Sequence, residues 1–305
     1  MSRFRHAVVT GAGRGIGREM ALLLADRGVA VTVLDVDAAA ARRVAAEVEV
    51  RGVASGAIAC DIRDAEALQV VAIEVEAARG PVDLLVNNAG IFVGGASLAT
   101  PQEAITRAFD VNLRGTMNGC AAFVPGMVAR GRGQVLNVAS LAGWMALPQM
   151  GIYSASKAAV IAYSEVLAAE LSATGVGVSL LCPSFVDTEL VARGQSSDDL
   201  RAFGGWLLRG LGQSPREVAR AGIDAAFAGR AVAVPARSGA LALAIKRRAP
   251  ARFAQATAFA ARLLGRMGLS PGRPTNLAQA GTGAGSRPVD PRIDGVAPAL
   301  QHMGA

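Results

Sequence analysis

Histidine is nearly missing from this chain of 305 residues, which contains only His6 and His302. Because they stand at opposite ends of the sequence, a histidine-based metal site and a Ser/His/Asp triad are both disfavoured. Cysteine is also scarce, and the three residues Cys60, Cys120 and Cys182 are odd in number and widely spaced. This pattern favours buried free thiols in a reducing compartment over a disulfide or a metal site, and no metal is expected.

Long hydrophobic runs are missing too. No uncharged stretch reaches the ~18 residues that a membrane span needs. The first residues, MSRFRHAVVTGAG, contain no apolar core of signal-peptide length before the glycine-rich run. We therefore expect a cytoplasmic enzyme. Aromatic residues make up only 4% of the chain, whereas hydrophobic residues make up 52%. This composition suits a tightly packed α/β domain with a full core.

The formal charge of +7 is confined to one end of the chain. Residues 1–245 contain 22 basic and 22 acidic residues, and residues 246–305 contain the other 9 basic and 2 acidic residues. A basic charge spread over the whole chain would suggest nucleic acid as a partner. This distribution shows only that the tail is basic, so no nucleic-acid partner is expected.

A glycine-rich turn follows the first predicted strand. The run HAVVT at residues 6–10 is short, apolar and β-branched, which predicts a buried strand, and an amphipathic helix, REMALLLADRG, comes after the turn. The glycines allow a tight turn, and the helix N-terminus offers free N–H groups to a pyrophosphate. This order predicts a phosphate cradle. Its candidate residues are Gly11, Arg14, Gly15, Ile16 and Gly17.

Asp35 ends the next predicted strand, residues 29–35, 18 residues after Gly17. In a dinucleotide fold an acid at this place bonds the adenosine ribose hydroxyls and repels a 2′-phosphate, which favours NAD. Arg14 argues the other way, because its guanidinium could face a 2′-phosphate, so NADP is not excluded. The simpler interpretation of Asp35 is a strand-end or turn acid.

Two more strand ends carry polar residues. The third predicted strand ends at Asp61 and Ile62, where an acid can bond an adenine amino group while the isoleucine packs on the ring. Alternatively, Asp61 caps the helix predicted for residues 64–78. The fourth predicted strand, residues 82–86, runs into Asn87 to Gly90, whose amides can bridge adjacent strands.

The stretch from Ser140 to Lys157 reads SLAGWMALPQMGIYSASK and carries the clearest chemistry. Tyr153 and Lys157 are four residues apart and share a helix face. An ammonium nearby favours the phenolate and lowers the pKa of a phenol from its usual value of ~10. Ser140 ends the strand predicted for residues 134–140 and could hold a substrate oxygen, since ligands bind at that end of open α/β sheets. Asn112, in a helix predicted for residues 101–126, reads by itself as a surface residue.

The last strands of the sheet follow a long irregular stretch. A sixth strand is predicted at residues 177–183, and residues 184–215 then lack a regular pattern, which is typical of a lid or binding segment. A helix opened by Ser214 and Pro215 leads to a seventh strand at residues 231–235.

Strands that alternate with helices predict an α/β fold, Rossmann-like and doubly wound, with a seven-stranded parallel sheet flanked by helices. The sequence predicts a domain at residues 1–240, a basic helical extension at residues 241–269 that is broken near Pro250, and a flexible tail at residues 270–305. The extension is expected to pack on the domain or on a partner subunit in preference to a membrane surface.

Apolar residues near the site are candidates to line a substrate pocket, although for each one alone a place in the core is the better explanation. Such a pocket would favour an apolar substrate of steroid, long-chain acyl or terpenoid type. The candidates are Phe92, Leu141, Trp144, Met150, Phe185, Phe203 and Trp206.

Together these residues resemble the short-chain dehydrogenase/reductase family in its single-domain form, over about residues 5–235. Thr10 to Gly17 match its cofactor loop, Asp61 its adenine-contacting acid and Asn87 to Gly90 its NNAG motif. One departure is Ser184, which follows Pro183 where the family commonly has glycine; we expect it to reshape the pocket without abolishing cofactor binding. The catalytic tetrad of the family is matched in order and spacing by Asn112, Ser140, Tyr153 and Lys157.

The resemblance implies an NAD(P)-dependent oxidoreductase that interconverts a secondary alcohol and a ketone. Tyr153 would exchange the proton, Lys157 would lower the pKa of Tyr153 and bond the nicotinamide ribose, and Ser140 would polarise the substrate oxygen. Asn112 would hold a water that links Lys157 to solvent. The implied cofactor-binding residues are Gly11, Arg14, Gly15, Ile16, Gly17, Asp35, Asp61, Ile62, Asn88, Ala89, Gly90, Tyr153, Lys157, Pro183, Val186 and Thr188.

Two other functions stay open at this point. One is an epimerase or dehydratase that uses bound nicotinamide without net redox chemistry, and the other is a non-catalytic nucleotide-binding regulatory protein. The complete set of four matched residues argues against both. The resemblance also implies a homodimer or homotetramer formed through helices at residues 101–126 and 152–173.

Overall fold

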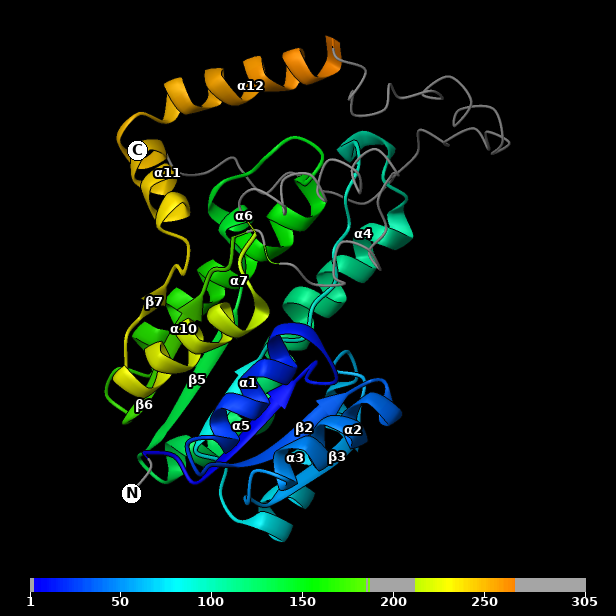
Figure 1. Ribbon diagram of the computed structural model, residues 1–305, viewed down its shortest axis with the longest axis vertical. Coiled ribbons are helices and arrows are strands. Elements are labelled where there is room, and N and C mark those ends of the chain that lie inside the picture. The colour runs from blue at the N-terminus through cyan, green and yellow to red at the C-terminus, as the bar shows by residue number, and fades with distance from the viewer. Residues whose placement is uncertain (1–2, 185, 187–211, 267–305) are drawn as a thin grey trace, which may run out of the picture. The chain divides into compact units, whose positions relative to one another are not determined.

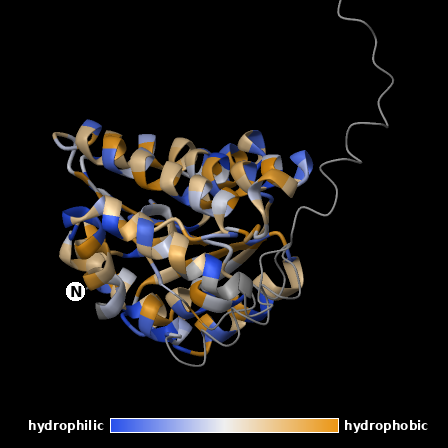
Figure 2. Cartoon of the chain, turned by 90° about the horizontal axis from the view of Figure 1, so that it is seen from above, coloured by the Kyte–Doolittle hydropathy of each residue, from blue (hydrophilic) through white to orange (hydrophobic). Residues whose placement is uncertain are grey.

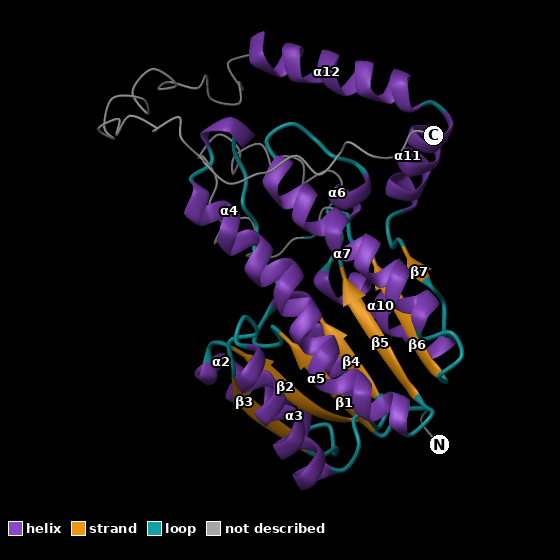
Figure 3. Ribbon diagram, turned by 180° about the vertical axis from the view of Figure 1, so that it is seen from behind, coloured by secondary structure: helices purple, strands orange, loops and turns teal. Residues whose placement is uncertain are grey.

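A parallel sheet lies at the centre of the structure, a computed structural model that describes residues 3–184, 186 and 212–266. Within these residues the sheet has seven strands in the order β3-β2-β1-β4-β5-β6-β7, all parallel, as predicted. The chain runs outward from β1 to β3, returns to β4 beside β1, and runs outward again to β7 (Figure 3). The strands are β1 His6–Thr10, β2 Ala30–Asp35, β3 Ser55–Ala59, β4 Leu84–Asn87, β5 Gly133–Val138, β6 Val176–Leu181 and β7 Val232–Ala233.

Helices cover both faces of this sheet (Figure 1). Helices α1, α2 and α10 pack into the core on one face, and α3, α5 and α7 pack into the core on the other. The ribbons carry patches of both hydropathies, as amphipathic helices do (Figure 2). The helices are α1 Gly15–Ala25, α2 Ala38–Glu49, α3 Ala65–Arg79, α4 Gln102–Phe109, α5 Gly115–Ala129, α6 Leu141–Trp144, α7 Gly151–Glu170, α10 Pro215–Ala228, α11 Arg237–Arg248 and α12 Pro250–Arg266.

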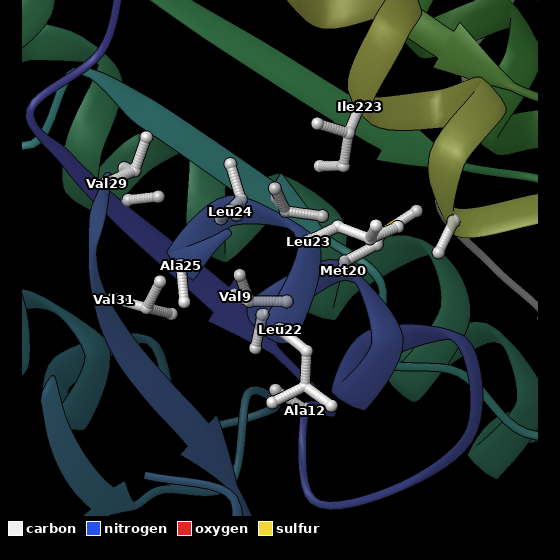
Figure 4. Packing of buried hydrophobic residues seen from close by; sticks show 14 of the residues in the cluster. Val9, Ala12, Met20, Leu22, Leu23, Leu24, Ala25, Val29, Val31 and Ile223 are labelled. Atoms are coloured by element: carbon white, nitrogen blue, oxygen red, sulfur yellow. The ribbon is translucent and has the colours of Figure 1, made fainter. Parts of the chain in front are cut away.

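Alternate residues of each strand enter opposite cores. Val9 of β1 packs with α1 and α10, whereas its neighbour Val8 packs with α3 and α5. Figure 4 shows the first core, in which Met20 and Leu24 of α1 and Ile223 of α10 surround the strands. Both faces of a parallel sheet are buried, which explains why the strands read as continuous apolar runs in the sequence. Each large side chain buried in this way contributes about 1.5–3 kcal/mol.

The long helix predicted for residues 101–126 is present but irregular. A π-helical turn at Asp110–Arg114 separates α4 from α5, and α5 continues to Ala129. Pro125 inside α5 has no N–H to give to the carbonyl of Ala121 one turn earlier. Gln69 of α3 donates to that carbonyl at 3.2 Å instead. The proline is therefore tolerated because a neighbouring helix supplies the missing donor.

Side-chain caps mark the starts of α10 and α3, and only the first of these caps is the predicted one. Ser214 and Glu217 form a reciprocal capping box at α10, with Pro215 at the first helical position. At α3 the cap is Asp64, which accepts from the Ala67 N–H at 2.9 Å. The alternative interpretation of Asp61 as the cap of that helix is therefore wrong.

The basic extension forms two helices. The first, α11, begins at Arg237, so the predicted boundary after residue 240 falls inside a helix. It ends at Arg248, and α12 begins at Pro250, where the sequence predicted a break. None of the helices in the described ranges is both long enough and apolar enough to span a membrane.

His6 at the start of β1 couples the stability of the sheet to pH. Its imidazole is buried, with Nδ1 3.1 Å from the Gly80 carbonyl and Nε2 2.9 Å from the Thr32 hydroxyl. Burial lowers the pKa of His6 below 6.5, because an imidazolium would lose its hydration. The folded state therefore binds this proton less readily than the unfolded state, and stability is lost as the pH falls below the unfolded pKa.

We expect the free energy of unfolding of the wild type to fall between about pH 7.5 and about pH 5, and to fall less in His6→Gln, which cannot titrate. Denaturant unfolding across this range measures both slopes. The carboxyl groups of Asp37, Asp61 and Glu217, whose pKa values are lowered, lose their contributions only at more acidic pH. Parallel pH profiles for the two proteins would contradict the role of His6.

Candidate active site

The predicted site residues lie at the carboxyl ends of four neighbouring strands. The glycine loop follows β1, Asp35 ends β2, the Asn88–Gly90 turn follows β4 and Ser140 follows β5. In an open α/β sheet this edge is where ligands bind, at the place where the strand order reverses. Here that place lies between β1 and β4.

Hydrogen bonds hold the glycine loop against the turn after β4. The Thr10 hydroxyl accepts from the N–H groups of Asn88 and Ala89, each at 3.1 Å. The Asn88 amide donates back to the carbonyls of Thr10 and Gly11, each at 3.0 Å. Gly11 has a φ of +62°, and a Cβ on it would lie 2.7 Å from the Ala89 Cα atom. The close approach of these two segments therefore requires glycine.

The start of α1 is arranged for an anion. No side chain caps this helix, and its first turn contains no acid. The first N–H groups of a helix have no partner within the helix, and the helix dipole makes this end positive. A pyrophosphate could bind there without displacing a protein group.

Asp35 and Asp37 arrange the charges beside the loop. The Asp35 carboxylate accepts from the Gly13 N–H at 2.8 Å and from the Asp37 N–H at 3.0 Å, so it already acts as the turn acid of the simpler interpretation. Arg14 forms an ion pair with Asp37 at 2.9 Å. Asp37 also caps α2 by accepting from Ala39 and Ala40. Residue spacing alone does not predict this ion pair, because it depends on how the loop folds over α2.

The predicted adenine contacts have other partners in the structure. The Arg63 guanidinium bonds the Asp61 carboxylate at 2.9 Å and holds the pKa of that carboxyl below its usual range. Ile62 points at α5, where a Cβ on Gly115 would lie 2.3 Å from its Cδ1 atom. Only 8% of Ile62 is exposed, which leaves little of its surface for an adenine ring.

Three of the four predicted catalytic side chains gather after β5. Ser140 caps α6 by accepting from the Ala142 N–H at 3.2 Å, and its hydroxyl lies near enough to Tyr153 to influence the pKa of the phenol. Lys157 lies one turn after Tyr153 on α7, and its ammonium donates to the Val138 carbonyl at 2.9 Å. All three side chains are buried.

Burial dominates the acid–base properties of this group. It raises the pKa of Tyr153 to about 12, and the nearby Ser140 hydroxyl opposes this rise only in part. It lowers the pKa of Lys157 to about 8, because a buried ammonium loses its hydration. The pKa of the phenol is thus raised overall by its own burial, and the lowering effect expected of Lys157 stays a prediction.

Asn112 is a buried residue that links two segments by hydrogen bonds, and it is not a surface residue. It lies in the π-helical turn with no exposed surface. Its side-chain oxygen accepts from the Ile91 N–H at 2.8 Å, and its NH₂ group donates to the Ile91 carbonyl at 3.0 Å and to the Ser156 hydroxyl at 2.9 Å. Both N–H donors of the amide are thus engaged, and the turn after β4 is fixed to α7 through Asn112.

Ser156 is a close neighbour of the site that the sequence pattern did not single out. Ser156 bonds Asn112 and also donates to the Tyr153 carbonyl at 2.8 Å. Its position three residues after Tyr153, on the same helix face, was the available signal. Gly90, predicted to lie beside the nucleotide, also lies beside these side chains, since a Cβ there would lie 3.0 Å from the Asn112 Oδ1 atom and 3.1 Å from the Lys157 Nζ atom.

The predicted pocket residues divide into separate groups. Phe92 and Met150 pack with Tyr153, and the Phe92 and Tyr153 ring centroids are 5.0 Å apart. Trp144 belongs to a different apolar cluster, behind Ala139 and Cys182. Leu141 lies against Gly239 of α11. Phe185, Thr188, Phe203 and Trp206 lie outside the described residues.

The segment after β6 closes over Ser140. Pro183 accepts from the Leu141 N–H at 2.8 Å, and its carbonyl is 3.5 Å from the Ser140 hydroxyl. Val186 pairs with Gln213 in an isolated bridge. Within the described part of the chain, no group of three or more His, Cys, Asp or Glu side chains is placed to hold a metal ion.

The strand order and the glycine loop define a nucleotide-binding α/β protein. The sequence profile of the family described as short chain dehydrogenase matches residues 5–199. The chain therefore belongs to the short-chain dehydrogenase family.

Relatives and solved structures agree with this assignment. The probable oxidoreductase EphD of Mycobacterium tuberculosis is 38% identical over 253 residues, which is 83% of this chain but only 41% of EphD. The D-threitol dehydrogenase of Mycolicibacterium smegmatis is 39% identical over 60% of this chain and 71% of its own length. A short-chain dehydrogenase/reductase from Burkholderia phymatum in complex with NAD is similar in structure, with a TM-score of 0.75, 27% identity and coverage of 90% and 98% of the two chains.

Gly17→Ala tests the packing of the loop. The added Cβ would lie 2.4 Å from both the Asn88 Nδ2 atom and the Gly11 carbonyl oxygen, so the loop must move. We expect the affinity for NAD, measured by calorimetric titration, to fall about tenfold or more, which corresponds to about 1.4 kcal/mol. Gly126→Ala on α5 is the matched control, because its Cβ meets only the ends of flexible side chains. Equal NAD affinity in Gly17→Ala and the wild type would rule out this packing constraint.

Proposed function

We propose that the protein is an NAD(P)-dependent oxidoreductase that interconverts a secondary alcohol and a ketone. The observation that carries this proposal is the meeting of a buried hydroxyl, phenol and ammonium, from Ser140, Tyr153 and Lys157, at the sheet edge beside the glycine loop. Relatives named oxidoreductase and dehydrogenase, and an NAD complex of similar fold, support it.

Several groups on this chain suit a dinucleotide. The uncapped start of α1 would take the pyrophosphate, and the Asp35 carboxylate would take the adenosine ribose hydroxyls. Lys157 has three N–H donors, and one of them bonds Val138, so it can also donate to the nicotinamide ribose. When bound, the nicotinamide supplies the hydride acceptor or donor, which no side chain can provide.

The protein's own contribution is the proton. A pKa of about 12 keeps the Tyr153 hydroxyl protonated at neutral pH, so it can donate to a carbonyl oxygen held beside it by Ser140. In the reverse direction the phenol must first lose that proton, and oxidation of the alcohol should become faster as the pH rises. Two hydrogen bonds hold these side chains in place. Lys157 donates to Val138 at the end of β5, and Asn112 accepts from the Ile91 N–H just after the turn that follows β4.

The charges beside the loop favour NAD over NADP. Arg14, which could otherwise bind a 2′-phosphate, is held by Asp37. The carboxylate of Asp35 adds a like charge that repels such a phosphate. The proposed preference for NAD therefore depends on two acids, Asp35 and Asp37.

The surroundings of Tyr153 favour an apolar substrate. Phe92, Ala142 and Met150 pack against the phenol, so polar groups on a substrate would find few partners there. We propose an alcohol or ketone of steroid, acyl or terpenoid type. A panel of apolar secondary alcohols and of polyols, each tested with NAD and NADP at the nicotinamide absorbance band, tests this class. Turnover of polyols alone would contradict the apolar substrate, and substrate conversion without any absorbance change would favour an epimerase or dehydratase.

We also propose a homodimer or homotetramer that uses the outer faces of α5 and α7. Met117 and Val128 on α5 and Val166 on α7 are apolar and exposed. Apolar side chains that face solvent on two neighbouring helices are typical of subunit interfaces.

Tyr153→Phe tests the acid–base role. The phenyl ring keeps the packing against Phe92 but carries no proton, so we expect kcat to fall by about 10²–10⁴-fold while NAD binding stays within a few-fold of the wild type. The chain has two tyrosines, and Tyr163→Phe makes the same chemical change away from the site, so it serves as the control. Steady-state assays and NAD titration measure the two effects. Turnover near the wild-type level in Tyr153→Phe would refute this assignment.

Asp37→Asn tests the cofactor preference. Asparagine caps a helix as well as aspartate does but cannot hold Arg14 by charge. We expect the ratio of kcat/KM with NADP to kcat/KM with NAD to rise about tenfold, and to return when Arg14→Gln is added. Asp64→Asn, the same change at the cap of α3, should leave the ratio unchanged. An unchanged ratio in Asp37→Asn would show that the ion pair does not govern the choice.

A further inference from the structure

Helices α11 and α12 hold the whole net charge of the protein. Residues 237–266 contain seven basic residues and no acidic one, whereas the rest of the chain contains 24 basic and 24 acidic residues. These helices also lie beyond residue 199, where the match to the family ends. The net positive charge therefore lies in helices outside the segment that the family profile matches.

The inner face of α11 is anchored to the domain beside the candidate site. Leu243 is buried, and Gly239 abuts Leu141 of α6. Lys246 donates to the Trp144 carbonyl, and the Arg247 guanidinium lies 5.6 Å from the centroid of the Trp144 indole. The helix is thus fixed to α6, the helix that Ser140 caps.

The outer face of α11 combines apolar and basic side chains. Leu241 and Ile245, one turn apart, are 63% and 52% exposed, and Arg248 follows on the same face. On α12, Arg252, Phe259 and Arg262 share a face by their spacing, and Phe259 is 67% exposed. Among the described residues, none of Arg248, Arg252 and Arg262 forms a salt bridge.

We propose that these outer faces of α11 and α12 dock on an anionic lipid surface. Exposed Leu, Ile and Phe gain by entering the boundary between headgroups and acyl chains, while the arginines between them bind the negative headgroups. A nucleic acid could pair with the arginines, but it would leave the exposed apolar side chains in water. A second copy of the chain, meeting this face symmetrically, would place one basic surface against another.

The anchor of α11 gives the docking a consequence for the site. Because α11 is tied to α6 by Trp144, docking would hold the residues after Ser140 close to the lipid surface. This consequence, but not the docking itself, depends on the proposed function. An apolar substrate dissolved in the lipid would then reach the candidate site without crossing much water.

Co-sedimentation of the full chain with vesicles tests the docking. The probes are vesicles of phosphatidylcholine alone and vesicles with about 30% phosphatidylglycerol. We expect the bound fraction to be about tenfold higher on the anionic vesicles and to fall as salt rises above about 0.1 M, where the Debye length is about 10 Å. Activity is not needed for this measurement, so its outcome is independent of the proposed oxidoreductase function.

Two sets of substitutions separate the contributions. The apolar set is Leu241→Ser, Ile245→Ser and Phe259→Ser, and the basic set is Arg248→Gln, Arg252→Gln and Arg262→Gln; each should lower binding to anionic vesicles about fivefold or more. Neither set touches Lys246 or Arg247, which hold Trp144. The control is Val36→Ser, Val50→Ser and Ile73→Ser, which removes equally exposed apolar side chains elsewhere and should bind like the wild type.

Equal binding of the wild type to neutral and anionic vesicles, or no binding to either, would overturn the proposal. An equal loss of vesicle binding in the control set would also overturn it, because it would mean that exposed apolar residues anywhere on the protein contribute to binding. Retention of a labelled RNA without retention on vesicles would assign the charge to nucleic acid and would also overturn it. Should the apolar set fold poorly by circular dichroism, the basic set, which leaves the apolar residues in place, decides the question.

Discussion

The hydrogen bonds between Thr10 and the turn after β4 join the two halves of the sheet where its strand order reverses. The other features of the site depend on this junction. It presses the glycine loop against Ala89, which leaves the start of α1 open, and it fixes the turn that Asn112 braces from the other side. Gly90, at the end of that turn, comes close enough to Lys157 that a larger residue would push the ammonium aside.

Desolvation determines the pKa values of the side chains that this packing brings together. The same burial raises the pKa of Tyr153 to about 12 and lowers that of Lys157 to about 8, so it moves the two values apart, each in the direction opposite to the one that attraction between a phenolate and an ammonium would give. The phenol is thereby kept as a proton donor at neutral pH. Ser140 opposes part of the shift, and it does so because it caps α6 at the end of β5 and is held in place by that role.

The sheet could be predicted from the sequence because strands that are buried on both faces consist of continuous apolar residues. Ser214 and Pro215 marked the start of a helix, and its capping depends only on residues next to each other in the chain. It also placed Ser140, Tyr153 and Lys157 together, since strand ends and helix faces follow from spacing. It could not predict the partners of Asp61 or Arg14, nor the direction of the Tyr153 pKa shift. Those depend on which side chains of distant segments meet and on how much water they lose, neither of which spacing determines.

We propose that a hydride leaves the substrate carbon while Tyr153 takes the proton of the alcohol. Transfer of deuterium tests it most directly, using the alcohol that the protein oxidises fastest, labelled at the carbinol carbon and incubated with unlabelled NAD. The account predicts that the label is recovered in the reduced nicotinamide, together with a slower rate for the labelled alcohol. Conversion of the substrate with the label lost to water, and none in the nicotinamide, would contradict it.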